Sequence, residues 1–116
     1  MKIVRLVRHG DNATVIDRLW VARSIMERTQ GLLARPQLQD GEGLMLAPCS
    51  SVHTVGMRYP IDVAFLDRHG VVRKCVPNLK VFRMAGCFGA ETTLEVLGGG
   101  LQRASIKVGD KLIMVD

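Results

Sequence analysis

The chain has 116 residues, of which 47% are hydrophobic and 23% are charged, and these values predict one soluble globular domain. Sixteen Lys and Arg residues against eleven Asp and Glu residues give a formal net charge of +5. The composition excludes a disordered chain, a collagen-like chain and a coiled coil. It also excludes a transmembrane helix, because no apolar run approaches the roughly 20 residues that cross a bilayer.

The first part of the chain predicts a β-hairpin followed by a helix. Residues 2–8 and 14–21 are rich in β-branched residues and flank a cluster of turn residues, a pattern typical of a hairpin. Ser24 and Glu27 form a capping box, in which each side chain bonds the backbone N–H of the other residue. The capping box predicts a helix that starts at Ser24 and that Pro36 ends.

The rest of the chain predicts short strands separated by turns. These strands cover residues 44–46, 61–66, 71–76, 92–97 and 111–115, and residues 101–104 form a short helical turn. Residues 49–59 and 77–90 are mixed and polar, so we expect irregular structure there. The fold class is therefore mainly β (α+β): a compact antiparallel barrel or jelly-roll-like sandwich of about seven short strands with one packed helix.

Several residues are expected to support the fold. Gly31 costs about 1 kcal/mol relative to Ala inside the predicted helix, so we expect another element to pack closely against it. Arg35 lies near the negative end of that helix, and we expect it to pair with Glu95 across the helix–sheet contact. Predicted structural roles fall to Gly31, Arg35, Pro60, Glu95, Gly109 and Asp110.

The cysteines indicate a reducing environment. Cys49, Cys75 and Cys87 are odd in number and widely spaced, and no CxxC motif is present. The first residues do not build the apolar stretch that a signal peptide needs, so we predict a cytoplasmic protein with free thiols. Cys49 and His53 are four residues apart, but the other ligand types lie at no motif spacing. We therefore predict neither a metal site nor a cofactor.

Arg8-His9-Gly10 resembles the strand-end signature of the histidine phosphatases, in which the histidine attacks phosphorus. That family needs a doubly wound α/β domain and a second histidine late in the chain, and this sequence predicts neither. A second Arg-His-Gly at residues 68–70 lies between two predicted strands, where it is turn chemistry. We therefore interpret Arg8-His9-Gly10 as a turn as well.

The segment from Cys49 to Asp67 is the most distinctive part of the sequence. Its candidate ligand-binding residues are His53, Thr54, Met57, Arg58 and Asp62. Alternation along the strand 61–66 places Asp62 on the face opposite to Ile61, and a covered carboxylate there needs hydrogen-bond donors. Arg58, His53 or loop N–H groups could supply them. Two roles for Asp62 stay open: it pins this loop structurally, or it belongs to a ligand-binding or catalytic site.

Several segments, taken in order, resemble the domain-of-unknown-function 192 family. The segments are residues 30–35, 41–46, 57–67, 90–98 and 108–110. Gln30 and Ala34 replace the Arg and second Gly of the family's helix motif, and Gly56 precedes Met57 where many members carry a Trp. The resemblance implies a small, mostly β, jelly-roll-like fold and no established activity. Members of this family often carry export signals.

Three hypotheses for function follow. The first is a non-enzymatic binding or accessory module, with a protein partner or a small ligand bound near the loop from His53 to Asp62. The second is a small enzyme that uses His53 and Asp62 as an acid–base pair. The third is weak nucleic-acid association through the basic N-terminal region, which the scattered charges and the 4% of aromatic residues disfavour. The oligomeric state is not predicted.

Overall fold

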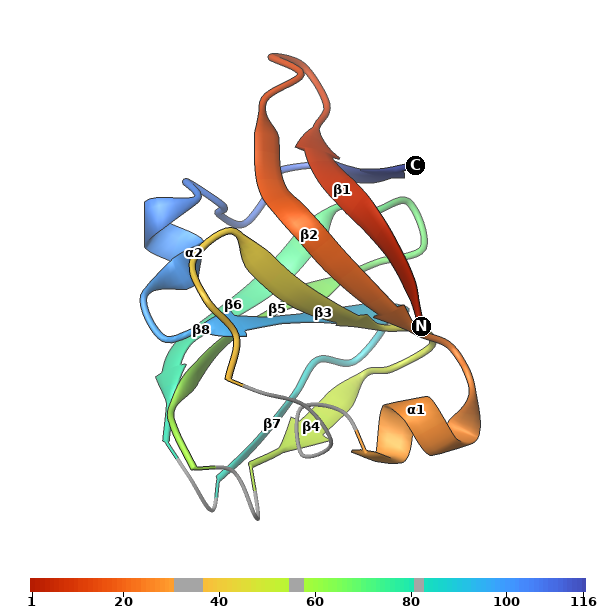
Figure 1. The fold of residues 1–116 in the computed structure, drawn as a ribbon, viewed down its shortest axis with the longest axis vertical. Coiled ribbons are helices and arrows are strands. Elements are labelled where there is room, and N and C mark those ends of the chain that lie inside the picture. Colours follow the sequence, from red (N-terminus) through yellow and green to blue (C-terminus); the bar gives the residue numbers. More distant parts are fainter. Residues whose placement is uncertain (31–36, 55–57, 81–82) are drawn as a thin grey trace.

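The computed structural model describes residues 1–30, 37–54, 58–80 and 83–116, and its main element is a curled seven-stranded sheet (Figure 1). The strand order is β6-β5-β8-β3-β2-β1-β9. The bounds are β1 (Lys2–Arg8), β2 (Thr14–Ala22), β3 (Glu42–Leu46), β5 (Ile61–Leu66), β6 (Val72–Leu79), β8 (Thr92–Leu97) and β9 (Leu112–Val115). A second sheet pairs β4 (Ser51–His53) with β7 (Met84–Gly86), and the helices are α1 (Ile25–Gln30) and α2 (Gly100–Arg103). The predicted mainly β fold is confirmed.

The two outermost strands, β6 and β9, approach each other at one end of the sheet. Val71, just before β6, forms a β-bridge with Lys111, just before β9. The N–H of Leu112 donates to the carbonyl of Gly70 at 2.9 Å. Gly70 has φ +81°, and a Cβ there would lie 2.5 Å from the carbonyl oxygen of Leu112, so the approach requires glycine. The sheet therefore curls into a half-barrel that is closed at one end.

Apolar side chains cover both faces of the central strands, and each face has its own core. The α2 face carries a cluster that includes Leu6, Leu94 and Leu101 of α2. The β4–β7 face carries a second cluster, to which β4 contributes Val52 and the segment before β3 contributes Leu38. Along β5, alternation places Ile61, Val63 and Phe65 in the second cluster, and Ala64 and Leu66 in the first. The predicted alternation of residues 61–66 is confirmed.

The predicted hairpins and the start of the helix agree with the structure. The N–H of Glu27 donates to Ser24 Oγ at 3.0 Å, and the N–H of Ser24 donates to Glu27 Oε1 at 3.3 Å, which confirms the capping box. Hydrogen bonds from the N–H groups of Arg23 and Ser24, and the nearby N-terminal amine, lower the pKa of Glu27. The predicted end of the helix at Pro36, together with Gly31 and Arg35, lies outside the described residues.

Three predictions about elements are wrong. Residues 51–53 and 84–86 form strands β4 and β7, although both were expected to be irregular. Strand β6 continues through Pro77 to Leu79, which is possible because β6 lies at the sheet edge and proline's missing N–H costs no ladder bond there. Strands β2 and β3 pair in parallel, with α1 in the connection between them, so the sheet is not antiparallel throughout.

No helix among the described residues is long and apolar enough to cross a membrane. Cys49, Cys75 and Cys87 are free thiols.

Candidate functional site

Asp62 is the most thoroughly bonded of the predicted site residues. It is 1% exposed, and its Oδ1 accepts the N–H groups of Asn78 at 2.8 Å and Gly99 at 3.0 Å. Its Oδ2 accepts the N–H of Leu101 at 3.0 Å. The carboxylate therefore ties β5 to β6, to the glycine-rich loop (residues 98–99) and to the first turn of α2. The donors that the structure shows lie on β6, at Gly99 and on α2, so the predicted donors, which were Arg58, His53 or N–H groups of the loop before β5, were wrong.

Asp62 also lines a pocket of about 600 Å³. The other lining residues include Cys75 and Asn78 of β6, Gln102 of α2 and residues of the glycine-rich loop. Burial, followed by the negative charges of Asp110 and Asp62, raises the pKa of the Cys75 thiol. A thiol with a raised pKa stays protonated at neutral pH and is a poor nucleophile. The polar groups on this side of the sheet are arranged to hold the fold together.

Thr54 joins the ends of two loops on the opposite side. It is fully buried, and its Oγ1 donates to the carbonyl of Lys80 at 2.6 Å and accepts the N–H of Arg83 at 2.8 Å. Its own N–H donates to the carbonyl of Arg83 at 2.8 Å. Thr54, the residue after β4, is therefore fastened to Lys80 after β6 and to Arg83 before β7.

The remaining predicted site residues are exposed or lie outside the description. His53 ends β4, opposite Met84 of β7, and its side chain is exposed. Arg58 and Pro60 are exposed on the loop that leads to β5, and Met57 lies outside the described residues. Val52, next to His53, packs in the cluster of the β4–β7 face, whereas Asp62 bonds the α2 region on the other face. This separation gives no support to an acid–base pair of His53 and Asp62.

The turn residues predicted to be structural are held by local bonds. Gly109 has φ +96°, and its N–H donates to the carbonyl of Val72 at 2.9 Å. Asp110 Oδ2 accepts the N–H of Lys107 at 3.0 Å. Residues 8–10 lie at the turn between β1 and β2, with the N–H of His9 donating to the carbonyl of Lys111 at 2.8 Å. Arg8-His9-Gly10 is therefore a turn in this fold.

Two stretches of the chain around β4, β6 and β7 carry a net positive charge because they contain no acidic residue. Residues 43–61 and 68–90 contain six of the sixteen Lys and Arg residues and none of the eleven Asp and Glu residues. We name the exposed side chains of His53, Arg58, Lys80, Arg83 and Met84 the basic loop surface. The sequence analysis missed this surface, because it assigned the basic surplus to the N-terminal region. The signal was the long acid-free stretch from residue 68 to residue 90.

Glu95 differs from Asp62 in having no donor among the residues that the structure describes. It is 6% exposed and lies on β8, paired with Leu44 of β3 and Val63 of β5. Within the described part of the chain, the Glu95 carboxyl group has no hydrogen bond or ion pair. Burial raises the pKa of Glu95 to about 7. The predicted partner, Arg35, lies outside the described residues, so the pairing stays a prediction.

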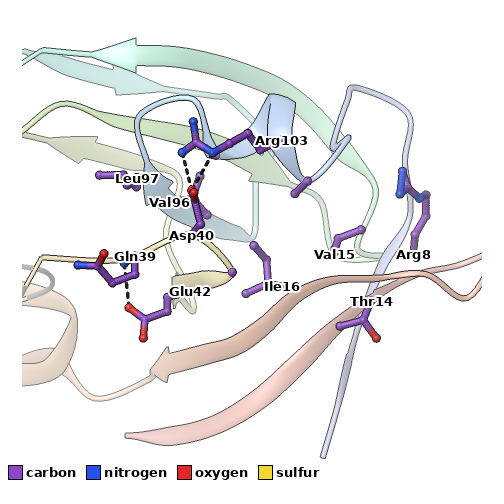
Figure 2. A pocket seen from close by; sticks show the side chains of 13 residues that line it. Arg8, Thr14, Val15, Ile16, Gln39, Asp40, Glu42, Val96, Leu97 and Arg103 are labelled. Atoms are coloured by element: carbon purple, nitrogen blue, oxygen red, sulfur yellow. Dashed lines mark hydrogen bonds and ion pairs between the residues drawn. The ribbon is translucent and has the colours of Figure 1, made fainter.

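Figure 2 shows another pocket, of about 300 Å³, between the β1–β2 hairpin and α2. Several of its polar groups are already bonded, although Arg8 Nε is buried without a hydrogen-bond partner among the described residues. Asp40 Oδ1 accepts from Nε and Nη2 of Arg103, both at 2.7 Å, and Glu42 Oε1 accepts the N–H of Gln39 at 2.8 Å. Arg8, at the far end, donates to the carbonyl of Ser105 at 2.7 Å. A ligand would have to displace these interactions.

Among the residues that the structure describes, no group of three or more His, Cys, Asp or Glu side chains could hold a metal ion.

The chain belongs to the DUF192 family, described as "Uncharacterized ACR", whose model matches residues 5–114. Comparison with the curated proteins gave no match. The fold is similar to that of a protein of unknown function from Novosphingobium aromaticivorans DSM 12444, with a TM-score of 0.83 and 26% identity over 96% of this chain and 84% of that chain. It is also similar to a candidate transcription regulator from Sinorhizobium meliloti 1021, with a TM-score of 0.81 and 21% identity over 97% of this chain and 92% of that chain.

Proposed function

We propose that this protein is a non-enzymatic binding module that recognises an acidic segment of a partner protein through the basic loop surface. The observation that carries the proposal is the uneven charge distribution. The two stretches around β4, β6 and β7 carry six cationic residues without one acid, whereas the rest of the chain carries ten Lys and Arg against eleven Asp and Glu. Three of the six, Arg58, Lys80 and Arg83, belong to the basic loop surface, and Arg73 is ion-paired with Asp67 outside it. Charge of one sign on one surface steers an oppositely charged partner and selects against others.

Hydrogen bonds of Thr54 support a preformed position for two of the basic residues. Thr54 holds the backbone of Lys80 and Arg83 against the end of β4. A backbone that is already held in place loses little conformational entropy on binding, which favours affinity.

Exposed apolar side chains next to these charges support a polypeptide as the partner. Met84 is 77% exposed, and Phe88, in the turn after β7, is fully exposed. Apolar and aromatic side chains at the centre of an interface supply much of the binding energy, and charges at the rim supply specificity. An acidic segment that also carries apolar residues matches this combination.

The proposal can be tested by fluorescence polarisation with a labelled acidic peptide of alternating Glu and Leu. We expect the wild-type protein to bind it, and the double variant Arg58→Glu/Lys80→Glu to bind at least tenfold more weakly. Lys111→Glu is the matched control, because Lys111 is exposed just before β9, away from this surface. We expect that variant to bind like the wild type.

Two results would overturn the proposal. One is the absence of peptide binding, or equal loss in the control variant. The other is tighter binding of a 20-nucleotide single strand or of phosphatidylserine vesicles under the same conditions, which would make the surface a nucleic-acid or membrane site. Affinity for a nucleic acid would also fall steeply with salt.

A further inference from the structure

The pocket that Asp62 lines is bounded by β6, the glycine-rich loop and α2. Its volume of about 600 Å³ lies within the range of about 300–1,000 Å³ that is usual for small-molecule sites. All of its lining residues belong to the described part of the chain. The pocket is separate from the basic loop surface, because no residue of that surface lines it.

The hydrogen bonds of Asp62 hold the walls of this pocket in place. Its carboxylate accepts the backbone N–H groups of Asn78, Gly99 and Leu101 at 2.8, 3.0 and 3.0 Å. These three donors are themselves lining residues, one on β6, one in the glycine-rich loop and one on α2. A pocket whose walls are already fixed loses little conformational entropy when a ligand binds. Asp62 is therefore a positioning residue for this pocket.

The glycine-rich loop gives the pocket a wall without side chains. Gly98 and Gly99 both line it, and Gly99 has φ +84°, a conformation that favours glycine. Since neither residue has a Cβ, a flat molecule can approach the backbone of this wall closely.

The other lining residues indicate the chemical class of the ligand. Pro77, Leu101 and Ile106 supply apolar surface, and the exposed residues Asn78 and Gln102 supply two carboxamide groups. A carboxamide both donates and accepts hydrogen bonds, so a pair of carboxamides suits a ligand group that also does both. The apolar surface and the glycine wall suit a planar ring that carries such a group.

The charge near the pocket disfavours an anionic ligand. Burial, followed by the negative charges of Asp110 and Asp62, raises the pKa of the Cys75 thiol, which lines the pocket. The same two charges repel a carboxylate or a phosphate group placed beside Cys75. None of the lining residues is Lys or Arg, so an anion would find no opposite charge there.

We propose that this pocket binds a neutral planar ring that carries an amide group, as an aromatic carboxamide or a lactam does. The amide group exchanges hydrogen bonds with the carboxamides of Asn78 and Gln102. The ring packs between the glycine-rich loop and the apolar side chains of Leu101 and Ile106. This inference is independent of the proposed function, because it concerns a small neutral molecule, whereas the basic loop surface is proposed to bind an acidic polypeptide.

The experiment titrates the isotope-labelled full chain with benzamide, nicotinamide or uracil and follows the N–H signals by NMR. We expect at least one of these amides to shift the signals of Asn78, Gly99 and Gln102 in a saturable way. Sodium benzoate has the shape of benzamide but a negative charge, and it should bind about tenfold more weakly than benzamide. No saturable shift with any of the three amides, or equal binding of benzoate and benzamide, would overturn the proposal.

Two variants test the carboxamide groups without removing a backbone hydrogen bond. Asn78→Gly keeps the N–H group that Asp62 accepts, and glycine tolerates the φ of +53° at this position. We expect Asn78→Gly and Gln102→Ala each to weaken binding about fivefold. Asn12→Gly is the matched control, because Asn12 is also exposed and has φ +58°, between β1 and β2. Unchanged affinity in both site variants, or an equal loss in the control, would contradict the proposal.

A second measurement uses the wild-type protein alone. Nuclear Overhauser effects between the ring protons of the bound amide and the methyl groups of Leu101 and Ile106 are expected. Effects to Val15 and Ile16 instead would place the ligand in the pocket between the β1–β2 hairpin and α2, and the proposal would be wrong.

Discussion

Asp62 and Glu95 are both buried carboxyl groups on adjacent strands of one sheet, yet their surroundings are opposite. Asp62 is 1% exposed and accepts three backbone N–H groups from β6, the glycine-rich loop and α2. Glu95 is 6% exposed and has only apolar neighbours along its row. The two carboxyl groups are thus similarly buried, and they differ in the hydrogen-bond donors that the described part of the chain places beside them.

Asp62 stabilises the fold through its hydrogen bonds, whereas the Glu95 carboxyl group makes no hydrogen bond in the described part of the chain. A buried carboxylate with several N–H donors is stabilised in its charged form and organises the segments that donate. A buried carboxyl group without donors costs stability when it ionises. Four substitutions test this contrast between Asp62 and Glu95.

The largest effect is expected from Asp62→Ala. The substitution leaves the N–H groups of Asn78, Gly99 and Leu101 without their acceptor, and we expect the free energy of unfolding to fall by about 3–5 kcal/mol. Urea denaturation measures the change. Asp17→Ala, at an exposed position of β2, should change stability by no more than about 0.5 kcal/mol. A loss below about 1 kcal/mol for Asp62→Ala would mean that its hydrogen bonds are not structural.

Glu95→Met should have the opposite sign. The pKa of Glu95 rises from 4.5 in the unfolded chain to about 7 in the folded protein, so the folded state retains a proton that the unfolded state has lost. Wild-type stability therefore falls by about 3 kcal/mol as pH rises from about 4.5 to about 7. The Met variant should lose this slope and be more stable at pH 8. Urea denaturation at pH 4 and pH 8 gives both values, and destabilisation at pH 8 would contradict the account.

Thr54→Val tests a fully bonded polar group on the same side as Glu95. It removes the bonds to the carbonyl of Lys80 and the N–H of Arg83, and we expect a loss of about 1–3 kcal/mol in the free energy of unfolding. Thr54→Ser keeps the hydroxyl and should recover most of that loss. If Val and Ser variants are equally stable, the two loops are not held by this hydroxyl.

Asp67 should give the smallest effect, because its partner Arg73 is largely exposed and solvent weakens the pair. Burial alone would raise the pKa of Asp67, but the N–H groups of Val71 and His69 and the Arg73 guanidinium together lower it. Its contribution is therefore present above the unfolded value of 3.8 and is lost as pH falls through the lower folded value. Asp67→Asn should be less stable than the wild type at pH 7, and the difference should vanish at pH 2. A difference that persists at pH 2 would show that the charge is irrelevant.

Local chemistry made much of the fold predictable. The Ser24–Glu27 capping box, the turn residues and the alternation along residues 61–66 depend on neighbours in the sequence, and the structure agrees with each of them. Strands β4 and β7 were missed because three residues are too few to show an alternating pattern. The parallel pairing of β2 with β3 was missed because it depends on a long connection, which leaves no local signal.

The candidate site was less predictable, because its properties depend on contacts between distant segments. The sequence indicated that Asp62 needed donors, but it could not show that these come from residues 16, 37 and 39 positions further along. Glu95 lies in the run Thr92–Leu97, whose pattern does not reveal that β8 is buried on both faces. The basic loop surface could have been found, because residues 68–90 contain no acid.

The most direct test of the contrast is a pH titration of the Glu95 carboxyl carbon by NMR in the wild-type protein. A midpoint near 7 is predicted, since burial raises the pKa of Glu95 and no donor lies beside it in the described part of the chain. A midpoint near 4.5, the value of an ordinary glutamate, would show that Glu95 is solvated or paired, and its contrast with Asp62 would then be wrong.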